Sequence, residues 1–151
     1  MDRVSRLLKV SATGKWKFGV KTNLSIRNYP TFSMDESSEL GGIDTLPTSL
    51  EYIVAALNGC SGMVILLVSK ELDFTFSGID FETTGIIYNP GLMGEEGVCT
   101  HFQKVCFQVD IQTEESEERI EQLKEEVERR CPVLNLLLDA GVKVDTKWSK
   151  K

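Results

Sequence analysis

A long apolar segment, residues 50–68, constrains the fold of this chain more than any other feature. Thr48 or Ser49 can cap a helix at its start, and the carboxylate of Glu51 lies in the first turn, where it suits the helix dipole. We expect one helix from there to about Lys70. Because apolar residues occur on almost all sides of this helix, it must be surrounded by protein, which predicts the central helix of the fold.

The same segment approaches the length of a membrane span. It contains several polar or small residues, however, and no basic residue closely precedes it: Glu51, Asn58, Gly59, Ser61 and Gly62 interrupt the run. These residues favour a buried helix of a soluble domain. The first residues lack the apolar core of a secretory signal, so we expect a cytoplasmic protein whose cysteines are reduced at rest.

Length and composition point to one soluble domain over residues 1–151. Hydrophobic residues make up 41% of the chain and charged residues 26%, which are ordinary values for a globular protein. The net charge of −6 and the pI of about 4.9 argue against a nucleic-acid partner, because such a partner requires a basic face to neutralise phosphates.

Period-two alternation and turn residues divide the rest of the chain into short elements. Two or three antiparallel strands, with Val4 in the first, are expected within residues 3–28, followed by a loop over residues 29–47 with room for one more short strand. After the long helix the expected order is strand, loop, strand, acidic helix, short helix and strand, over residues 74–88, 89–97, 103–111, 113–131, 132–141 and 142–148. This order predicts an α+β fold with a mainly antiparallel sheet.

Two of the four cysteines lie where thiol chemistry is favoured. Cys60 lies in the middle of the long apolar helix. Cys131 directly precedes Pro132, so the backbone N–H groups that open the next helix are expected to favour its thiolate. Two thiols so placed indicate redox chemistry with a transient disulfide. The alternative is that each is a small buried hydrophobic residue, since free cysteine is among the most buried residue types.

The surroundings of Cys60 leave further alternatives open. Gly59 and Gly62 each cost roughly 1 kcal/mol relative to alanine inside a helix, so they indicate either close approach of another helix or room for a substrate beside the sulfur. The other two cysteines, Cys99 and Cys106, lie in or near a predicted strand and are interpreted as structural. A metal site built from the cysteines and the single His101 is not favoured, because no paired ligand spacing is present.

Two motifs resemble those of a known family. Residues 40–63 contain Leu-Gly-Gly-Ile-Asp-Thr-Leu-Pro and Leu-Asn-Gly-Cys-Ser-Gly, and residues 130–137 read Arg-Cys-Pro-Val-Leu-Asn-Leu-Leu. In both the chain is similar to the OsmC/Ohr family (osmotically inducible protein C and organic hydroperoxide resistance proteins). It is closer to the less-characterised Gly-Gly-Cys branch, with Asn58 in place of the first glycine. The resemblance implies an OsmC/Ohr-like α+β fold in which two chains intertwine, with an antiparallel sheet wrapped around long central helices.

The resemblance also implies an activity. Proteins of this family reduce organic hydroperoxides to alcohols in the oxidative stress response, and by motif position Cys60 is the peroxidatic thiol and Cys131 the resolving one. The implied protein is a homodimer with the active site at the dimer interface. It needs no metal or organic cofactor, and an external dithiol, of lipoyl type by resemblance, reduces the disulfide again.

One departure from the family pattern leaves a second function open. In the organic hydroperoxide resistance branch a glutamate stands one residue further from the cysteine, where this chain has Leu50. Glu51 is therefore a candidate to orient a cation at the site, or only a first-turn carboxylate. The matching arginine is not evident, and Arg27 is the nearest candidate in sequence. The alternative function is an OsmC-fold protein that binds apolar small molecules or exchanges thiols and disulfides, with little peroxidase activity.

Overall fold

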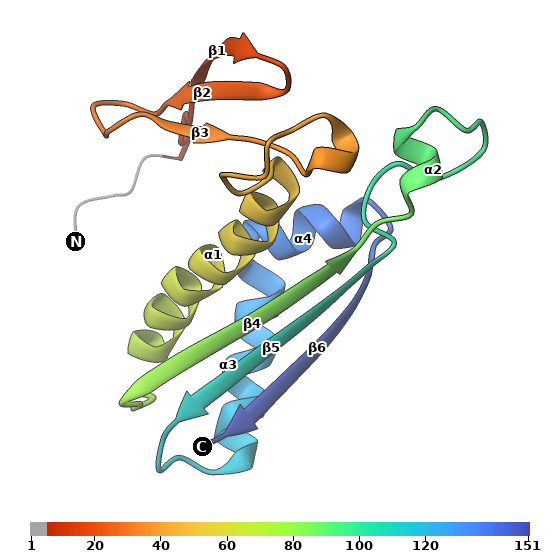
Figure 1. The fold of residues 1–151 in the computed structure, drawn as a ribbon. Helices are drawn as coiled ribbons and strands as arrows, with labels where there is room; N and C mark the ends of the chain where they lie inside the picture. Colours follow the sequence, from red (N-terminus) through yellow and green to blue (C-terminus); the bar gives the residue numbers. More distant parts are fainter. Residues whose placement is uncertain (1–5) are drawn as a thin grey trace. The chain divides into compact units, whose positions relative to one another are not determined.

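The computed structural model describes residues 6–151, so Val4 of the predicted N-terminal strands lies outside the described residues. The chain divides into two compact units, one ending at Tyr52 and the other running from Ile53 to Lys151 (Figure 1). The expectation of a single domain over residues 1–151 stays a prediction.

The first unit contains a three-stranded antiparallel sheet in the order β1-β2-β3. Its strands are β1 (Thr13–Phe18), β2 (Lys21–Ser25) and β3 (Phe32–Met34). In the turn between β1 and β2, Gly19 has a positive φ of 53°, and its carbonyl accepts a hydrogen bond from the Trp16 indole N–H at 2.8 Å. Two of the expected strands are confirmed over residues 13–25, as is a short one in the segment that is otherwise loop, whereas residues 6–12 form no strand.

A buried carboxylate organises the loop that follows β3. The Asp35 side chain accepts hydrogen bonds from the backbone N–H groups of Ile43 and Thr45, each at 3.3 Å. Backbone hydrogen bonds, first of all that from Glu36, hold the pKa of Asp35 below its ordinary value. A short 3-10 helix, η1 (Ser38–Leu40), lies within the same loop. The predicted loop is therefore an ordered turn around one carboxylate.

Helix α1 (Ser49–Glu71) is the predicted long helix, and its ends match the prediction to within a residue. The backbone N–H of Thr48 donates to the Glu51 carboxylate at 2.7 Å, and the Glu51 N–H donates to the Thr48 hydroxyl at 3.2 Å. This reciprocal pair is a capping box, which fixes the start of the helix. The expected burial on all sides is wrong for a single chain, because one side of α1 is exposed.

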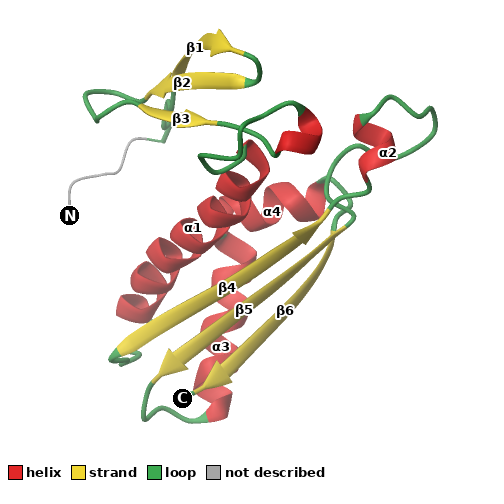
Figure 2. Ribbon diagram, viewed as in Figure 1, coloured by secondary structure: helices red, strands yellow, loops and turns green. Residues whose placement is uncertain are grey.

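The second unit contains the sheet β4-β5-β6 with helices on one of its faces (Figure 2). The elements are β4 (Gly78–Ile86), α2 (Asn89–Leu92), β5 (Lys104–Gln112), α3 (Glu117–Arg130), α4 (Pro132–Asp139) and β6 (Lys143–Lys150). β4 and β5 are antiparallel as predicted, whereas β5 and β6 are parallel. The parallel pairing follows from the crossover through α3 and α4, which returns the chain to the end of the sheet from which β5 starts.

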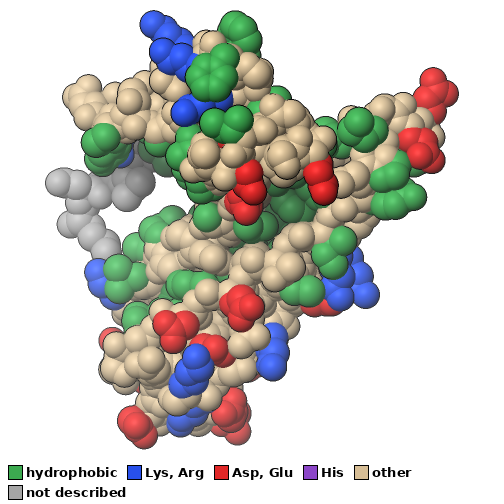
Figure 3. Space-filling model, viewed as in Figure 1, with side chains coloured by type: hydrophobic (Ala, Val, Ile, Leu, Met, Phe, Trp, Pro, Cys, Tyr) green, Lys and Arg blue, Asp and Glu red, His purple; other side chains and the backbone are tan. Residues whose placement is uncertain are grey.

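The core of the second unit lies between this sheet and its helices. One face of β5 and the apolar stripe of α3 are buried, as their sequence periods predict: Val105, Phe107, Val109 and Ile111 on the strand, and Ile120, Leu123 and Val127 on the helix. Charged side chains of both signs are visible on the surface in Figure 3. Two ion pairs, Lys104–Asp145 at 2.7 Å and Lys151–Asp110 at 2.9 Å, occupy the other face of the sheet. The sheet is thus covered on one face only within a single chain.

Helix α1 also has the length and composition of a membrane span, with 23 residues. Its polar side chains, however, bind other elements of the same chain. Asn58 is hydrogen-bonded to Thr83 of β4, and Ser61 to Cys131. These contacts are those of a helix packed within an α+β fold, as its polar residues predicted.

Candidate active site

The structure brings the two predicted redox cysteines together. Cys60, in the middle of α1, is half-buried, and Cys131, between α3 and α4, is fully buried. The Cys131 thiol lies close enough to Cys60 to raise the pKa of the Cys60 thiol, and the Cys131 sulfur lies 3.5 Å from the hydroxyl of Ser61, the residue next to Cys60. Both thiols are free. Two residues 71 positions apart in sequence thus form one dithiol site.

The place of Cys131 is set by the junction between α3 and α4. Cys131 has an extended backbone (φ −71°, ψ 113°) and is both the C-cap residue of α3 and the N-cap residue of α4. Pro132 begins α4, where its missing N–H costs nothing. The Asn135 side-chain amide donates to the carbonyls of Glu128 and Cys131, both at 2.9 Å. Asn135 therefore locks the bend that carries the thiol, a role that its place in the motif did not reveal.

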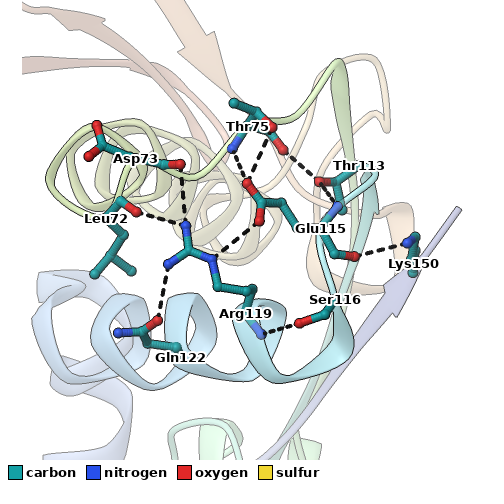
Figure 4. A network of polar contacts seen from close by, with 9 residues as sticks. All are labelled: Leu72, Asp73, Thr75, Thr113, Glu115, Ser116, Arg119, Gln122 and Lys150. Atoms are coloured by element: carbon teal, nitrogen blue, oxygen red, sulfur yellow. Dashed lines mark hydrogen bonds and ion pairs between the residues drawn. The ribbon is translucent and has the colours of Figure 1, made fainter.

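An arginine network ties the start of α3 to the end of α1 (Figure 4). The Arg119 guanidinium donates to the Leu72 carbonyl at 2.7 Å and to the Asp73 carbonyl at 3.3 Å, and it pairs with Glu115 at 3.2 Å. These carbonyls end a helix and have no partner within it. Because the network fixes α3 against α1, it also fixes where Cys131 meets α1.

A second ion pair joins the same two helices close to the cysteine. Arg130 donates to both carboxylate oxygens of Glu71, at 2.5 and 3.0 Å. The hydrogen bonds from Arg130 hold the pKa of Glu71 below its ordinary value. The pair is largely exposed, so it orients the helices more than it stabilises them.

The electrostatics of Cys60 favour a neutral thiol in the isolated chain. Burial is the largest effect and raises the pKa of Cys60, and the neighbouring Cys131 thiol raises it further. The backbone N–H of Val133, in the first turn of α4, lowers the pKa of Cys60 and so opposes this shift. Among residues 6–151, no positive charge contributes to this shift. The predicted helix-start donor therefore exists, but it serves Cys60 and not Cys131, whose side chain makes no capping hydrogen bond.

The remaining candidates belong to the first unit. The Glu51 carboxylate accepts the capping hydrogen bond from Thr48, as expected of a first-turn carboxylate. Arg27 has a positive φ of 48° and stacks its guanidinium on the Tyr29 ring at 4.7 Å, with a hydrogen bond of 2.9 Å to the Tyr29 hydroxyl. The predicted catalytic role of Glu51 stays a prediction.

The two glycines near Cys60, Gly59 and Gly62, have different surroundings. A Cβ atom on Gly62 would meet the Phe81 ring of β4 at 3.6 Å, so this glycine lets the sheet approach α1. A Cβ atom on Gly59 would meet nothing within 4 Å, which leaves open space at the residue before Cys60. At Gly62 the close neighbour is thus a strand, and not another helix as expected. At Gly59, next to Cys60, open space is present.

The other sulfur and imidazole groups lie away from the dithiol. Cys99 is exposed, and its thiol contacts the His101 carbonyl at 3.9 Å. Cys106 of β5 is half-buried and lies opposite Thr84 of the neighbouring strand β4. Among residues 6–151, no group of three or more His, Cys, Asp or Glu side chains is arranged to hold a metal ion.

An α+β chain with two neighbouring thiols, one on a long helix and one at a helix junction, defines the class to which this protein belongs. The family model described as OsmC-like protein matches residues 42–147. The chain therefore belongs to the OsmC-like family, as the two cysteine motifs predicted. A comparison with curated protein sequences finds no match.

Solved structures share this fold over nearly the whole chain. An OsmC-like protein from Mycoplasma pneumoniae is 15% identical, with a TM-score of 0.78 and 99% of each chain covered. Two proteins described as organic hydroperoxide resistance proteins are also similar. The one from Elizabethkingia anophelis is 19% identical (TM-score 0.77, 98% and 100% covered). The one from Legionella pneumophila is 17% identical (TM-score 0.76, 96% and 99% covered). At these identities the likeness establishes the fold.

Proposed function

We propose that this protein is a cysteine-based peroxidase that reduces organic hydroperoxides to alcohols. The observation that carries the proposal is the proximity of the two cysteines: the Cys131 sulfur lies 3.5 Å from the hydroxyl of Ser61, the residue next to Cys60, and the Cys131 thiol raises the pKa of Cys60. The family supports it, since related structures are described as organic hydroperoxide resistance proteins. Cys60 is the peroxidatic residue because it is half-buried and the residue before it borders open space, whereas Cys131 is sealed from solvent.

The reaction proceeds in three steps. The Cys60 thiolate attacks the outer oxygen of a hydroperoxide, the O–O bond breaks, and the leaving alkoxide takes a proton to become the alcohol. Cys60 is now a sulfenic acid. The Cys131 sulfur attacks the Cys60 sulfur, the S–O bond breaks, and water leaves with the proton of Cys131. An external dithiol then reduces the disulfide by exchange and is itself oxidised.

Apolar side chains near Cys60, at the part of the exposed side of α1 that we assign to the substrate and not to a partner chain, favour alkyl hydroperoxides over hydrogen peroxide. Ile53 and Met63 lie one to two turns from Cys60 and are 40% and 49% exposed. An alkyl group that covers them gains about 25 cal/mol for each Å² of apolar surface removed from water. Hydrogen peroxide offers no such surface.

The exposed side of α1 supports the homodimer that the family resemblance implies. From Ile53 to Leu67, the exposed residues of α1 are all apolar: Ile53, Ala55, Ala56, Gly59, Met63, Leu66 and Leu67. A contiguous apolar face of this kind marks an interface. Beyond the part assigned to the substrate, the occupant is a second copy of this chain, whose own α1 presents the same face, so that the two long helices lie at the centre of the pair.

Peroxidase activity requires a cation that the second unit does not bring to Cys60. Burial alone keeps the thiol protonated, and the attacking species is the thiolate. Arg27 is our candidate, from the same chain or from the partner, with the Glu51 carboxylate orienting it. A dithiol of lipoyl type is the proposed reductant, without metal or organic cofactor, and the proposed location is the cytoplasm.

Replacement of Cys60 by serine tests the assignment. With dihydrolipoamide as reductant, consumption of cumene hydroperoxide should fall to background in Cys60→Ser. In Cys131→Ser, when the reductant is limiting, consumption should continue for one turnover and then stop. Cys106→Ser, which removes a thiol outside the site, should match the wild-type protein. Unchanged turnover in Cys60→Ser would refute the proposal.

The raised pKa of Cys60 favours one alternative, an apolar-ligand binder or general thiol–disulfide exchanger with little peroxidase activity. Intact-mass analysis after brief treatment with cumene hydroperoxide distinguishes them. A peroxidase loses two hydrogen atoms per chain, at Cys60 and Cys131. A binder keeps its mass, and an exchanger forms mixed disulfides with thiol partners but does not prefer the hydroperoxide.

A further inference from the structure

A buried hydroxyl next to the dithiol, that of Ser61, contacts the Cys131 sulfur but has no role in the reaction steps proposed above. Ser61 follows Cys60 in α1 and is fully buried, with no exposed surface. Its oxygen lies 3.5 Å from the sulfur of Cys131, which is also fully buried. The Cys131 thiol therefore lies between two groups of the same helix turn, the Cys60 sulfur and the Ser61 hydroxyl.

Buried serines on this helix differ in how they are used. Ser69, two turns further along, is 4% exposed, and its hydroxyl has no hydrogen-bond partner. A hydroxyl buried without a partner costs free energy, so burial alone does not explain a serine. Ser61, in contrast, has a sulfur as its partner, and that sulfur belongs to the proposed resolving residue.

We propose that Ser61 is a positioning residue for Cys131: its hydroxyl holds the sulfur beside Cys60 and donates a hydrogen bond to the thiolate that attacks the sulfenic acid. The inference rests on the proposed function and adds to it the group that assists the second step. In the resting state either atom can be the donor. Once Cys131 has lost its proton, only Ser61 can donate.

The hydroxyl acts on one step of the reaction. As the Cys131 sulfur bonds to the Cys60 sulfur, the S–O bond of the sulfenic acid breaks, and the departing hydroxide leaves as water with the proton that Cys131 gave up. Negative charge therefore passes through the Cys131 sulfur in an interior without water. A hydrogen bond to a charged group is among the stronger ones in proteins, and the N–H of Val133 is engaged by Cys60. Ser61 supplies the donor that Cys131 otherwise lacks.

The test separates the two steps in Ser61→Ala. Rapid mixing with cumene hydroperoxide, with dimedone trapping and intact-mass analysis, measures formation of the sulfenic acid and its conversion to the disulfide. Loss of one hydrogen bond to a charged sulfur lowers its thiolate fraction about tenfold. The thiolate of a less acidic thiol is a better nucleophile, and this gain in reactivity offsets about half of the tenfold loss on a logarithmic scale. Disulfide formation should therefore be about threefold slower.

Three readouts accompany this slowing in Ser61→Ala. The rate of sulfenic acid formation stays at its wild-type value. The sulfenic acid accumulates, and excess peroxide converts more of Cys60 to the sulfinic acid. The rise of the second rate with pH moves to higher pH, which a purely structural role would not cause. Ser69→Ala, the matched control, removes an equally buried hydroxyl without a partner and behaves as wild type.

Each outcome decides the matter. Wild-type rates and pH profile in Ser61→Ala overturn the inference and leave the proposed function standing. Equal slowing of both steps also overturns it, because the serine then acts on the packing of α1. If wild-type protein does not react with hydroperoxide, the proposed function fails. In that case oxidation by diamide, which forms the same disulfide without a sulfenic acid, still shows whether Ser61→Ala slows the attack by Cys131.

Discussion

The two faces of α1 in the second unit differ from those of an ordinary surface helix, because both are rich in apolar residues and the polar side chains lie toward the inside. Such a helix turns its apolar residues inward and its polar residues to solvent. Here the polar side chains Asn58, Ser61 and Ser69 lie on the buried or half-buried side, and the exposed side is apolar as far as Leu67. Two of these inward-facing groups make specific contacts within the chain, Asn58 to Thr83 and Ser61 to Cys131, whereas the Ser69 hydroxyl has no partner.

The difference between the faces shows that hydrophobicity alone does not locate the core of one chain. Leu57 and Leu66 are the same residue type on the same helix, yet Leu57 has no exposed surface and Leu66 is 49% exposed. The first is covered within a single chain. A second copy of the chain is our proposed cover for the second, and the predictions below separate the two faces.

The largest effect is expected from a charge on the exposed face. Leu66→Asp places a carboxylate in each half of the proposed dimer interface, and each unpaired buried charge costs about 3–5 kcal/mol. We expect the wild-type dimer to become monomeric, measured by sedimentation velocity, while the chain stays folded by circular dichroism.

A leucine of similar exposure on another element provides the control. Leu92 of α2 is 52% exposed, and Leu92→Asp should leave the assembly unchanged. A monomeric wild-type protein, or a dimer that survives Leu66→Asp, would remove the proposed role of this face.

A smaller effect is expected from a cavity on the buried face. In the Leu66→Asp monomer, where assembly does not add to stability, Leu57→Ala should lower the free energy of unfolding by about 2–5 kcal/mol, the range for a fully buried leucine. Leu67→Ala, on the exposed face, should lower it by less than about 0.5 kcal/mol in the same background. Urea denaturation measures both, and equal losses would contradict the asymmetry.

Local patterns in the sequence were sufficient for the longer helices and strands, but not for the short helix α2, which lies in a segment predicted as a loop. The capping residues before α1 and the apolar stripe of α3 are short-range signals, and both elements lie where these signals predict. The direction of β6 was not accessible in the same way. Val142, Val144 and Trp148 alternate equally well in a parallel or an antiparallel strand, and only the crossover through α3 and α4 decides between them.

The site was predictable only as far as its sulfur atoms. The motifs around Cys60 and Cys131 identified the pair, and the structure brings the two together. The donors could not be assigned, because hydrogen bonds between distant segments depend on how α4 packs against α1. The N–H of Val133 thus acts on Cys60 and not on Cys131. Ser61, which in the sequence looks like any small helical residue, is a hydrogen-bond partner of the Cys131 sulfur.

The smallest effect, and the one that links the two faces to the chemistry, is expected in the ionisation of Cys60. Burial and the Cys131 thiol raise its pKa above the ordinary value of 9.0 in the isolated chain. A thiol with a raised pKa adds stability below the pKa of the unfolded chain and loses it as pH rises through the folded pKa. The Leu66→Asp monomer should therefore lose stability above about pH 9. Cys60 in this monomer should react with iodoacetamide only at a pH above that of a cysteine peptide.

If assembly supplies the missing cation, the midpoint of this reaction should lie at least about one pH unit lower in the wild-type dimer than in the monomer. Arg27→Ala in the dimer should then restore the higher midpoint, while Arg27→Lys, which keeps the charge, should restore it only in part. The alkylation rate of Cys60, followed by peptide mass spectrometry from pH 6 to about pH 10, measures the difference. Identical midpoints in monomer and dimer would show that the exposed face of α1 contributes to assembly but not to the reactivity of the thiol.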